Sequence, residues 1–213
     1  MYMTIEEIYK TRWQVRQYDE ANIPDKDLIK SLVNKTFELS PSKQNLMPFR
    51  VHVLGPEQLE YKKQFWNISK GKKGGANNYN IFAPYLFMFT FREVTNPNLK
   101  VKMAIKYGHD YTCCTPQYKK AKIPNSLEIG MFASILTGLA LEKKLAVSYL
   151  LCFPDFERDS KDYEEILPFL KGDYPVFCMS LGYTFGVKEV DDRHKSPTDL
   201  EYKPEIDEII NWI

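Results

Sequence analysis

The sequence has few histidines, few cysteines and almost no net charge, and each shortage excludes a class of chemistry. Its 213 residues include three histidines, none with a recognisable nucleophile and carboxylate partner, and no Gly-x-Ser-x-Gly turn, so serine-hydrolase chemistry has no support. The four cysteines are too few for a disulfide framework. The formal charge of +1 gives no general attraction to nucleic acid or to an anionic membrane.

Long apolar runs and glycine fingerprints are also missing. The longest apolar stretch, residues 81–91, is interrupted by Pro84 and is shorter than the about 20 residues that a membrane helix needs. Charged residues such as Glu6, Glu7 and Lys10 argue against a signal peptide at the N-terminus. The basic loop at 71–75 does not match a P-loop and is interpreted as a mobile loop near an active-site mouth. We therefore expect a cytoplasmic protein with no membrane or nucleic-acid partner.

The adjacent Cys113 and Cys114, together with His109, are the only group in the sequence that resembles a set of metal ligands. They lack the Cys-x-x-Cys spacing and the second ligand pair of zinc sites, so we expect no bound metal. A redox switch at the adjacent pair stays an alternative. Cys152 and Cys178 lie in apolar runs, where cysteine usually acts as a small buried hydrophobe.

The chain does contain enough apolar material for a full core. Hydrophobic residues make up 44% of the sequence and aromatic residues 14%, which suits one α/β or α+β domain. The apolar periodicity alternates between helical and extended segments. It predicts helices at 25–37, 56–68 and 127–144 and strands at 50–54, 84–91 and 175–179.

Two helix starts near the N-terminus carry capping residues. Thr4 and Glu7 have the form of a capping box, and Asp25 is a candidate N-cap for the next helix. The residues of the first helix that we expect to face inward are Ile5, Ile8 and Tyr9. Those of the second helix are Leu28, Ile29, Leu32, Val33 and Phe37.

A third helix start is predicted at Asn125, with Glu128 completing the cap. The helix that follows, over residues 127–144, is apolar almost all round. A helix of this kind is buried, either at the centre of a domain or in a subunit interface. The residues from Pro204 to Ile213 are also rich in apolar side chains and are expected to dock on another surface, with a partner subunit as one candidate.

The segment Pro41-Ser42-Lys43-Gln44-Asn45-Leu46-Met47-Pro48-Phe49 has the composition of a rigid ligand-binding turn beside a strand. The two prolines restrict φ, and Phe49 can anchor the turn in the core. Ser42 and Asn45 can offer a hydroxyl and a carboxamide to the edge of a flat heterocycle. The alternative, in which these two side chains only satisfy the backbone of their own loop, stays open.

A pair of arginines lies about thirty residues upstream, in Arg12-Trp13-Gln14-Val15-Arg16-Gln17-Tyr18. Arg12 and Arg16 share a face whether the segment is helical or extended. The planar fork of a guanidinium matches the oxygens of a phosphate and stays charged at any working pH. The spacing predicts a paired cationic site for phosphate, with two solvated surface arginines as the alternative.

A second basic cluster, Arg193-His194-Lys195-Ser196-Pro197, follows Ser180-Leu181-Gly182-Tyr183 near the C-terminus. In this order, Arg-x-Gln-x-Arg-x-Tyr, Pro-Ser-x-x-Asn-x-x-Pro-Phe, Leu-Gly-Tyr and Arg-x-Lys-x-Pro resemble the motifs of the FMN-dependent nitroreductase family. The resemblance runs from about residue 5 to about residue 200. It implies an α+β fold, a three-layer α/β/α sandwich with a mostly antiparallel central sheet, in an intertwined homodimer. It also implies one FMN-binding domain over residues 1–213, with a C-terminal arm from about residue 200.

The same resemblance implies roles for the basic residues. Arg12 matches the arginine that grips the FMN phosphate, and Arg193 and Lys195 match a C-terminal pair that closes on the same group. Arg16 matches the cation beside the N1 and C2 carbonyl edge of the flavin ring. A fixed cation there would stabilise the negative charge that the reduced flavin carries near N1.

Ser42 and Asn45 match residues that reach the cofactor across the dimer interface. Two positions close to the motifs depart from the family pattern. Gln14 stands where the family usually has a phosphate-binding serine, and its longer side chain can still donate. Met47 replaces a common glutamine, which leaves an apolar and polarizable surface.

The pair Leu151-Cys152 stands where some branches of the family have Glu-Gly near flavin N5, and a backbone N–H can supply the N5 hydrogen bond there. The implied activity is hydride transfer from NADH or NADPH through flavin N5 to a small acceptor such as a nitroaromatic or a quinone, with no catalytic side chain required. Two alternatives stay open. One is a flavin-binding protein with little reductase activity, such as a regulatory or flavin-fragmenting relative; the other is a lysine-rich nucleic-acid or phosphoprotein binder, against which the near-neutral charge argues.

Overall fold

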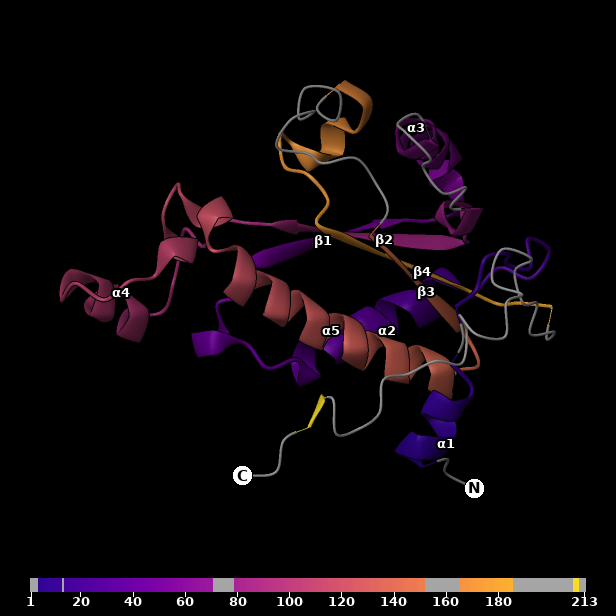
Figure 1. Cartoon of the computed structure of the whole chain (residues 1–213), viewed down its shortest axis with the longest axis horizontal. Coiled ribbons are helices and arrows are strands. Elements are labelled where there is room, and N and C mark those ends of the chain that lie inside the picture. The colour runs from indigo at the N-terminus through magenta and orange to yellow at the C-terminus, as the bar shows by residue number, and fades with distance from the viewer. Residues whose placement is uncertain (1–3, 13, 71–78, 152–164, 186–208, 211–213) are drawn as a thin grey trace.

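A four-stranded antiparallel sheet forms the centre of the protein (Figure 1). The structure is a computed structural model and describes residues 4–12, 14–70, 79–151, 165–185 and 209–210. The strands are β1 (Phe49–Leu54), β2 (Tyr85–Phe91), β3 (Ala146–Leu150) and β4 (Phe177–Gly182). Their order in the sheet is β1-β2-β4-β3, and every neighbouring pair is antiparallel.

The predicted strands are confirmed, and the continuous apolar run becomes a central strand. All seven residues of β2 are buried, because β2 lies between β1 and β4 and is covered on both faces. Side chains alternate along a strand, so Phe87 and Phe89 belong to one core and Leu86 and Met88 to the other. An unbroken apolar sequence is what a strand buried on both faces requires.

Helices cover the two faces of the sheet in separate layers (Figure 1). One face carries α2 (Lys26–Leu39) and α5 (Lys122–Glu142). The other carries α3 (Leu59–Lys70) and a 3₁₀ turn, Pro168–Leu170. The larger core fills the α2 and α5 side and the smaller one the α3 side. The expected three-layer α+β sandwich is therefore confirmed.

The capping box of α1 (Ile5–Lys10) is present, but the expected inward face of this helix is not. The Thr4 side chain accepts from the Glu7 backbone N–H, and the Glu7 carboxylate accepts from Thr4. Ile5 is 78% exposed, so its predicted burial is wrong for a single chain. The helix is held instead by the Tyr9 hydroxyl, which donates to the Ser134 carbonyl in α5 at 2.9 Å.

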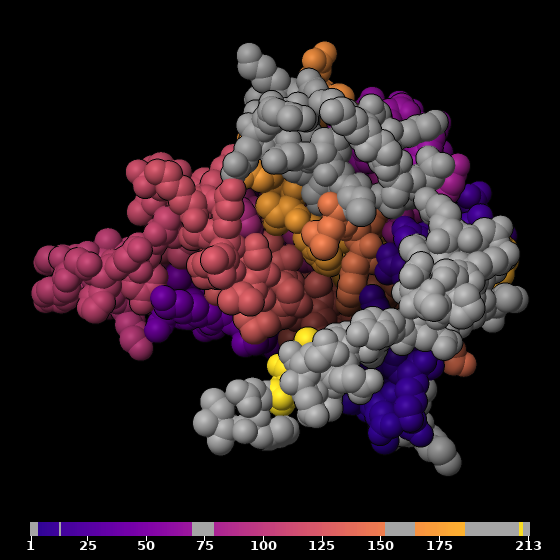
Figure 2. All heavy atoms as spheres, viewed as in Figure 1, coloured from indigo at the N-terminus to yellow at the C-terminus, as the bar shows by residue number. Residues whose placement is uncertain are grey.

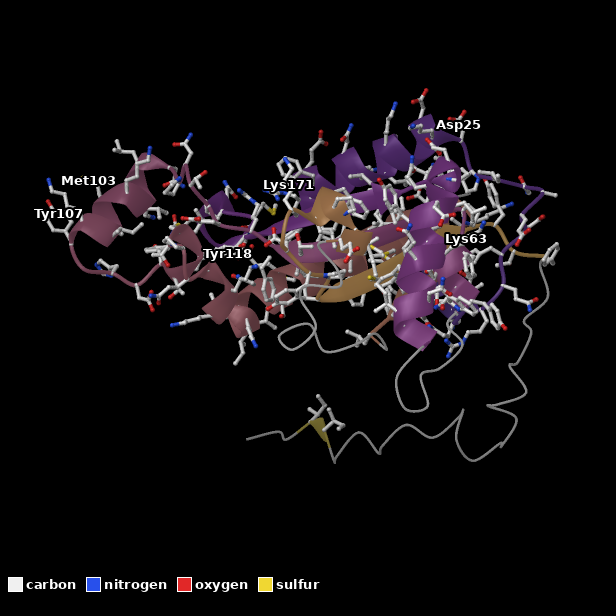
Figure 3. The ribbon with its side chains drawn as sticks, turned by 90° about the horizontal axis from the view of Figure 1, so that it is seen from above. Asp25, Lys63, Met103, Tyr107, Tyr118 and Lys171 are labelled. Carbon is white, nitrogen blue, oxygen red and sulfur yellow. The ribbon has the colours of Figure 1, made fainter. Side chains whose placement is uncertain are left out.

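Asp25 caps α2 as expected, by accepting from the Asp27 backbone N–H at 2.8 Å (Figure 3). The buried stripe of α2 contains Ile29, Leu32 and Thr36. Phe37 is 60% exposed, so its assignment to the core is wrong. Thr36 can be buried because its hydroxyl donates to the Leu32 carbonyl one turn back.

The predicted start of α5 at Asn125 is also wrong. The helix begins at Lys122, and Asn125 lies buried within its first turns, where its carboxamide donates to the Tyr118 carbonyl at 3.3 Å. In a single chain the helix is not buried on all sides, since Leu127 is 64% exposed and Ile123 and Met131 are exposed with it, and its burial in a subunit interface stays a prediction. Asn125 does not act as the N-cap, because it lies inside the helix and its carboxamide bonds a carbonyl of the preceding turn.

One helix was not predicted from the sequence. α4 (Leu99–Lys106) lies in the segment between β2 and α5 and projects away from the sheet (Figures 1 and 2). Its exposed Met103 and the following Tyr107 lie at the far end of this projection (Figure 3). Over the described ranges, no helix combines the length and the apolar character needed to cross a membrane. The loop at 71–75 and most of the arm at 200–213 lie outside those ranges.

Candidate functional site

The segment that carries the two N-terminal arginines runs beside β3. Residues 14–18 are without helix or strand, and Val15 and Tyr18 are buried against Ala83. Their burial anchors the segment to the body of the protein. The neighbouring polar side chains at 12 and 14 contact β3.

Arg12 combines a stacked guanidinium with an unsatisfied buried donor. Its Cζ lies 4.6 Å from the centre of the Tyr149 ring in β3. Its Nε is buried and has no hydrogen-bond partner in the part of the chain that the structure describes. Leaving a buried donor unpaired costs about 1–3 kcal/mol, and more for a charged group. An anion that accepts from this N–H would remove the cost, and the assignment of Arg12 to the FMN phosphate stays a prediction.

The Gln14 carboxamide forms hydrogen bonds with β3 of the same chain. Its Nε2 donates to the Ser148 hydroxyl at 2.7 Å and to the Tyr149 carbonyl at 2.9 Å. The Tyr149 backbone N–H donates back to Gln14 Oε1 at 3.4 Å. Both amide hydrogens are occupied, so in this conformation Gln14 fixes the N-terminal segment to β3. Its assignment as a cofactor contact stays a prediction.

Arg16 lies in different surroundings from Arg12. It lines a hollow of about 260 Å³ together with Gln17, Tyr18, Glu20, Tyr79 and Phe82. Three aromatic residues, one cation and one carboxylate line this hollow, and a flat group suits it because a guanidinium and aromatic faces both stack on such a group. The role of Arg16 at a flavin ring is not tested by these contacts and stays a prediction.

A buried polar network that sequence reasoning missed supports this region. The Ser148 hydroxyl accepts from Gln14 and from the Asn80 carboxamide, each at 2.7 Å. The Asn80 carbonyl in turn accepts from the Ser180 hydroxyl at 2.6 Å. The network ties the N-terminal segment to β3 and β4, over sequence separations of 68 to 134 residues. No local sequence signal marks such long-range partners.

The turn at residues 42–47 is held in a conformation that its residue types disfavour. Gln44, Asn45 and Met47 have φ of 57°, 56° and 43°, in the left-handed region. This conformation costs a residue such as Gln44 or Met47 about 1–2 kcal/mol, and it costs asparagine less. Such conformations persist only where surrounding contacts impose them, and they cluster at ligand sites.

Three long-range contacts hold the turn. Arg92 donates from Nε to the Met47 carbonyl at 2.7 Å and from Nη2 to the Leu46 carbonyl at 2.8 Å. The buried Glu128 of α5 accepts from the Lys43 backbone N–H at 3.1 Å. Asn98 donates to the Gln44 carbonyl at 2.9 Å. The turn is therefore preorganised by the body of the protein, and neither Arg92 nor Glu128 was identified from the sequence in this role.

Ser42 and Asn45, the two predicted ligand-binding residues of the turn, differ in which of their polar groups remain available. The Ser42 hydroxyl accepts from the Met47 backbone N–H at 2.8 Å, which is the loop-satisfying role left open above. Its own O–H hydrogen is not used in that bond. Asn45 is exposed, so its carboxamide faces away from the core. Phe49 is buried among the rings of Phe89 and Phe132, which confirms its role as the anchor.

The structure brings some predicted site residues together and separates others. Arg12 and Gln14 lie against β3, and Leu151 directly follows β3 and is 68% exposed. Ser42 and Asn45 lie instead beside the first half of α5, through the contact of the neighbouring Lys43 with Glu128. Cys152, Arg193 and Lys195 are outside the described residues.

Comparison with known proteins identifies the fold. No protein-family profile and no curated protein matches the chain. Solved structures do match over almost the whole length. A nitroreductase family protein from Streptococcus pneumoniae has a TM-score of 0.63 at 15% identity and covers 99% of this chain and 100% of its own.

Two further similar structures are of proteins described as acting on FMN or binding it. A proposed NAD(P)H:FMN oxidoreductase from Staphylococcus epidermidis has a TM-score of 0.72 at 12% identity, over 99% of this chain and 96% of its own. A proposed nitroreductase from Exiguobacterium sibiricum, solved in complex with FMN, has a TM-score of 0.65 at 16% identity, over 100% and 99%. The protein therefore has the α+β fold of the nitroreductases, as the motifs implied.

Proposed function

We propose that the protein is an FMN-dependent oxidoreductase that passes hydride from NADH or NADPH to a small acceptor, such as a nitroaromatic or a quinone. The nitroreductase fold and the descriptions of its structural neighbours support the class of reaction. The observation that carries the proposal within this chain is the buried Nε of Arg12 beside β3, which has no hydrogen-bond partner among the described residues. When bound, FMN supplies hydride transfer at N5.

The residues of the chain would bind and orient the cofactor. Arg12 would donate to the phosphate, joined by Arg193 and Lys195 from the C-terminal region. Arg16 would place its positive charge at the N1 edge of the ring, where it lowers the energy of the reduced state. The backbone at Leu151 and Cys152 would meet N5.

We further propose that the active form is a homodimer. Ser42 and Asn45 flank Lys43, which contacts Glu128 of α5, whereas Arg12 contacts β3, and a second copy can bring the two groups to one cofactor. The exposed side of α5 offers a largely apolar hollow of about 600 Å³ for that copy. It is lined by Lys122, Ile123, Ser126, Leu127, Gly130, Met131 and Ser134. Exposed apolar surface of this kind is typical of subunit interfaces.

Titration of flavin-free protein with FMN, followed by flavin fluorescence, tests the cofactor. The Arg12→Gln variant removes the charge and is expected to weaken FMN binding by about 1.5–3 kcal/mol, the contribution of a hydrogen bond to a charged group. Arg50→Gln is the matched control, because Arg50 lies in β1 and makes only a 3.8 Å ion pair with Asp173. Wild-type protein that binds no FMN, or equal affinities for the two variants, contradicts the proposal.

The occupied carboxamide of Gln14 favours one alternative, a flavin-binding protein with little reductase activity. If Gln14 donates no hydrogen bond to the FMN phosphate, the cofactor can bind in a different position from that in an active reductase. Steady-state oxidation of NADH and NADPH with menadione or nitrofurazone separates the two functions. Turnover at the about 1–10³ s⁻¹ of ordinary enzymes supports the reductase, and FMN binding without turnover supports the alternative.

A further inference from the structure

The adjacent cysteines at the start of the segment that leads to α5 take no part in the proposed flavin chemistry. Cys113 and Cys114 lie in a 3₁₀ turn, Thr112–Cys114, with their Sγ atoms 3.9 Å apart. Both are free thiols and half-buried. The turn is fixed at both ends, because the Cys114 N–H donates to the Tyr111 carbonyl at 2.8 Å and the Cys113 carbonyl accepts from Val94 at 2.9 Å. Two thiols are thus held side by side on a rigid turn.

A disulfide is poorly suited to this pair. Neighbouring Cα atoms across a trans peptide are about 3.8 Å apart, and the described part of the chain contains no cis peptide. An ordinary disulfide needs a Cα separation of at least about 4.4 Å. A single larger atom bonded to both sulfurs relieves this mismatch, because the two sulfurs then stay apart.

The surroundings favour a neutral bridging atom over a metal cation. The thiols pack against the buried Leu46, Val94 and Val101. Burial, together with the neighbouring Cys114, raises the pKa of the Cys113 thiol to about 11. Within the described residues, no group of three or more His, Cys, Asp or Glu side chains could hold a metal ion. A metal would need more ligands and charged thiolates, and the site provides neither.

We propose that Cys113 and Cys114 form a dithiol site that captures trivalent arsenicals, with the organic group on arsenic lying against the apolar wall of Leu46, Val101 and Tyr111. In this reaction an organoarsenous acid loses both hydroxyl groups. Two As–O bonds break, two As–S bonds form, and each thiol proton leaves in a molecule of water. Arsenic stays trivalent, no electrons are transferred, and the product is neutral.

Mass spectrometry with phenylarsonous acid as the probe tests the site without any need for FMN. Intact wild-type protein is expected to gain one phenylarsenic bridge and to lose two hydrogens. After digestion with trypsin, the gain should lie in the peptide Tyr107–Lys119, which contains Cys113 and Cys114 but neither of the other cysteines. The adduct should survive excess glutathione, a monothiol, and be removed by ethanedithiol. No adduct, or an adduct on another peptide, overturns the proposal.

Single variants test whether both sulfurs are required. Two-point attachment raises apparent affinity by about 10²–10⁴-fold, so Cys113→Ser and Cys114→Ser should each lower apparent affinity by about 100-fold or more. Cys178→Ala is the control, since Cys178 lies buried in β4 and should leave the affinity unchanged. A single variant that keeps wild-type affinity overturns the proposal. Should a variant fail to fold, the location of the adduct in the wild-type peptide still decides.

Discussion

At the scale of single residues, Lys62 is a charged group placed inside the protein. It is 2% exposed, and its Nζ donates to the carbonyl oxygens of Ala83 at 2.7 Å and Pro84 at 3.0 Å. These bonds attach α3 to the segment before β2, next to the aromatic residues that line the Arg16 hollow. Burial lowers the pKa of Lys62 to about 8, although the nearby Glu57 acts in the opposite direction.

The lowered pKa of Lys62 predicts a stability that depends on pH. Below pH 8 both folded and unfolded chains hold the proton, and the full cost of burying the charge is present. Between pH 8 and the ordinary value of 10.5, the unfolded chain binds more protons, so the free energy of unfolding contributed by this group rises with pH. Urea denaturation at pH 7.5, 8.5 and 9.5 should therefore show the free energy of unfolding of wild-type protein rising with pH relative to that of Lys62→Met.

The comparison with Lys62→Met isolates the lysine from other groups. Burial raises the pKa of Tyr18 far above its usual range, and ionisation of that phenol in the unfolded chain acts in the opposite direction at still higher pH. Both proteins carry Tyr18, so its effect cancels in the difference. A constant difference between the two proteins from pH 7.5 to 9.5 contradicts the prediction.

At the scale of elements, the turn at 42–47 shows how a strained segment is kept in place. Its left-handed residues are held by side chains from β2's end and from α5, so the turn is rigid without glycine. A preorganised turn loses less conformational entropy when it meets a ligand. The exposed Asn45 carboxamide is therefore presented at little cost.

Removal of Arg92 should loosen this turn. Arg92→Met deletes the bonds to the Met47 and Leu46 carbonyls, and we expect a loss of about 1–3 kcal/mol in the free energy of unfolding. Lys102→Gln is the control, because the Lys102 ammonium makes only an exposed 3.0 Å hydrogen bond to Asn96 and should change stability by less than about 0.5 kcal/mol. Urea denaturation measures both. Equal losses in the two variants would show that Arg92 does not hold the turn.

At the scale of the whole molecule, α5 has an exposed apolar side that no other element covers within the described part of a single chain. Figure 2 shows part of α5 on the surface of the protein. Three apolar side chains of this helix, Ile123, Leu127 and Met131, are exposed. The other sides of α5 pack into the main core. Because this side is apolar as well, we expect another surface to cover it. The proposed homodimer would do so and would bring Ser42 and Asn45 near a partner's flavin.

Leu127→Glu tests the dimer by placing a charge on that surface. Sedimentation should give twice the monomer mass for wild-type protein and the monomer mass for the variant, because a buried unpaired charge is costly. FMN affinity should fall in parallel. Leu59→Glu, at the start of α3 on the opposite layer, is also exposed in the single chain and should leave both measurements unchanged. A monomeric wild-type protein contradicts the proposal.

Elements with local signals were predictable. The capping box at Thr4, the cap at Asp25 and the apolar run of β2 each depend on residues close together in the sequence, and the structure confirms all three. The start of α5, the exposure of Ile5 and Phe37, and the existence of α4 were missed or wrong. Each of those depends on what lies beside the element in space.

The sequence by itself indicated the fold class, most of the helices and strands and the candidate residues of the site, because periodicity, caps and short motifs are local properties; it did not indicate α4 or β3. Only the tertiary structure decided how the site residues are used. It gave the Gln14 carboxamide to β3, left the Arg12 Nε buried without a partner among the described residues, and fixed the 42–47 turn through Arg92. The physical reason is that buried donors and acceptors find their partners across distances of up to 135 residues, which no local pattern encodes.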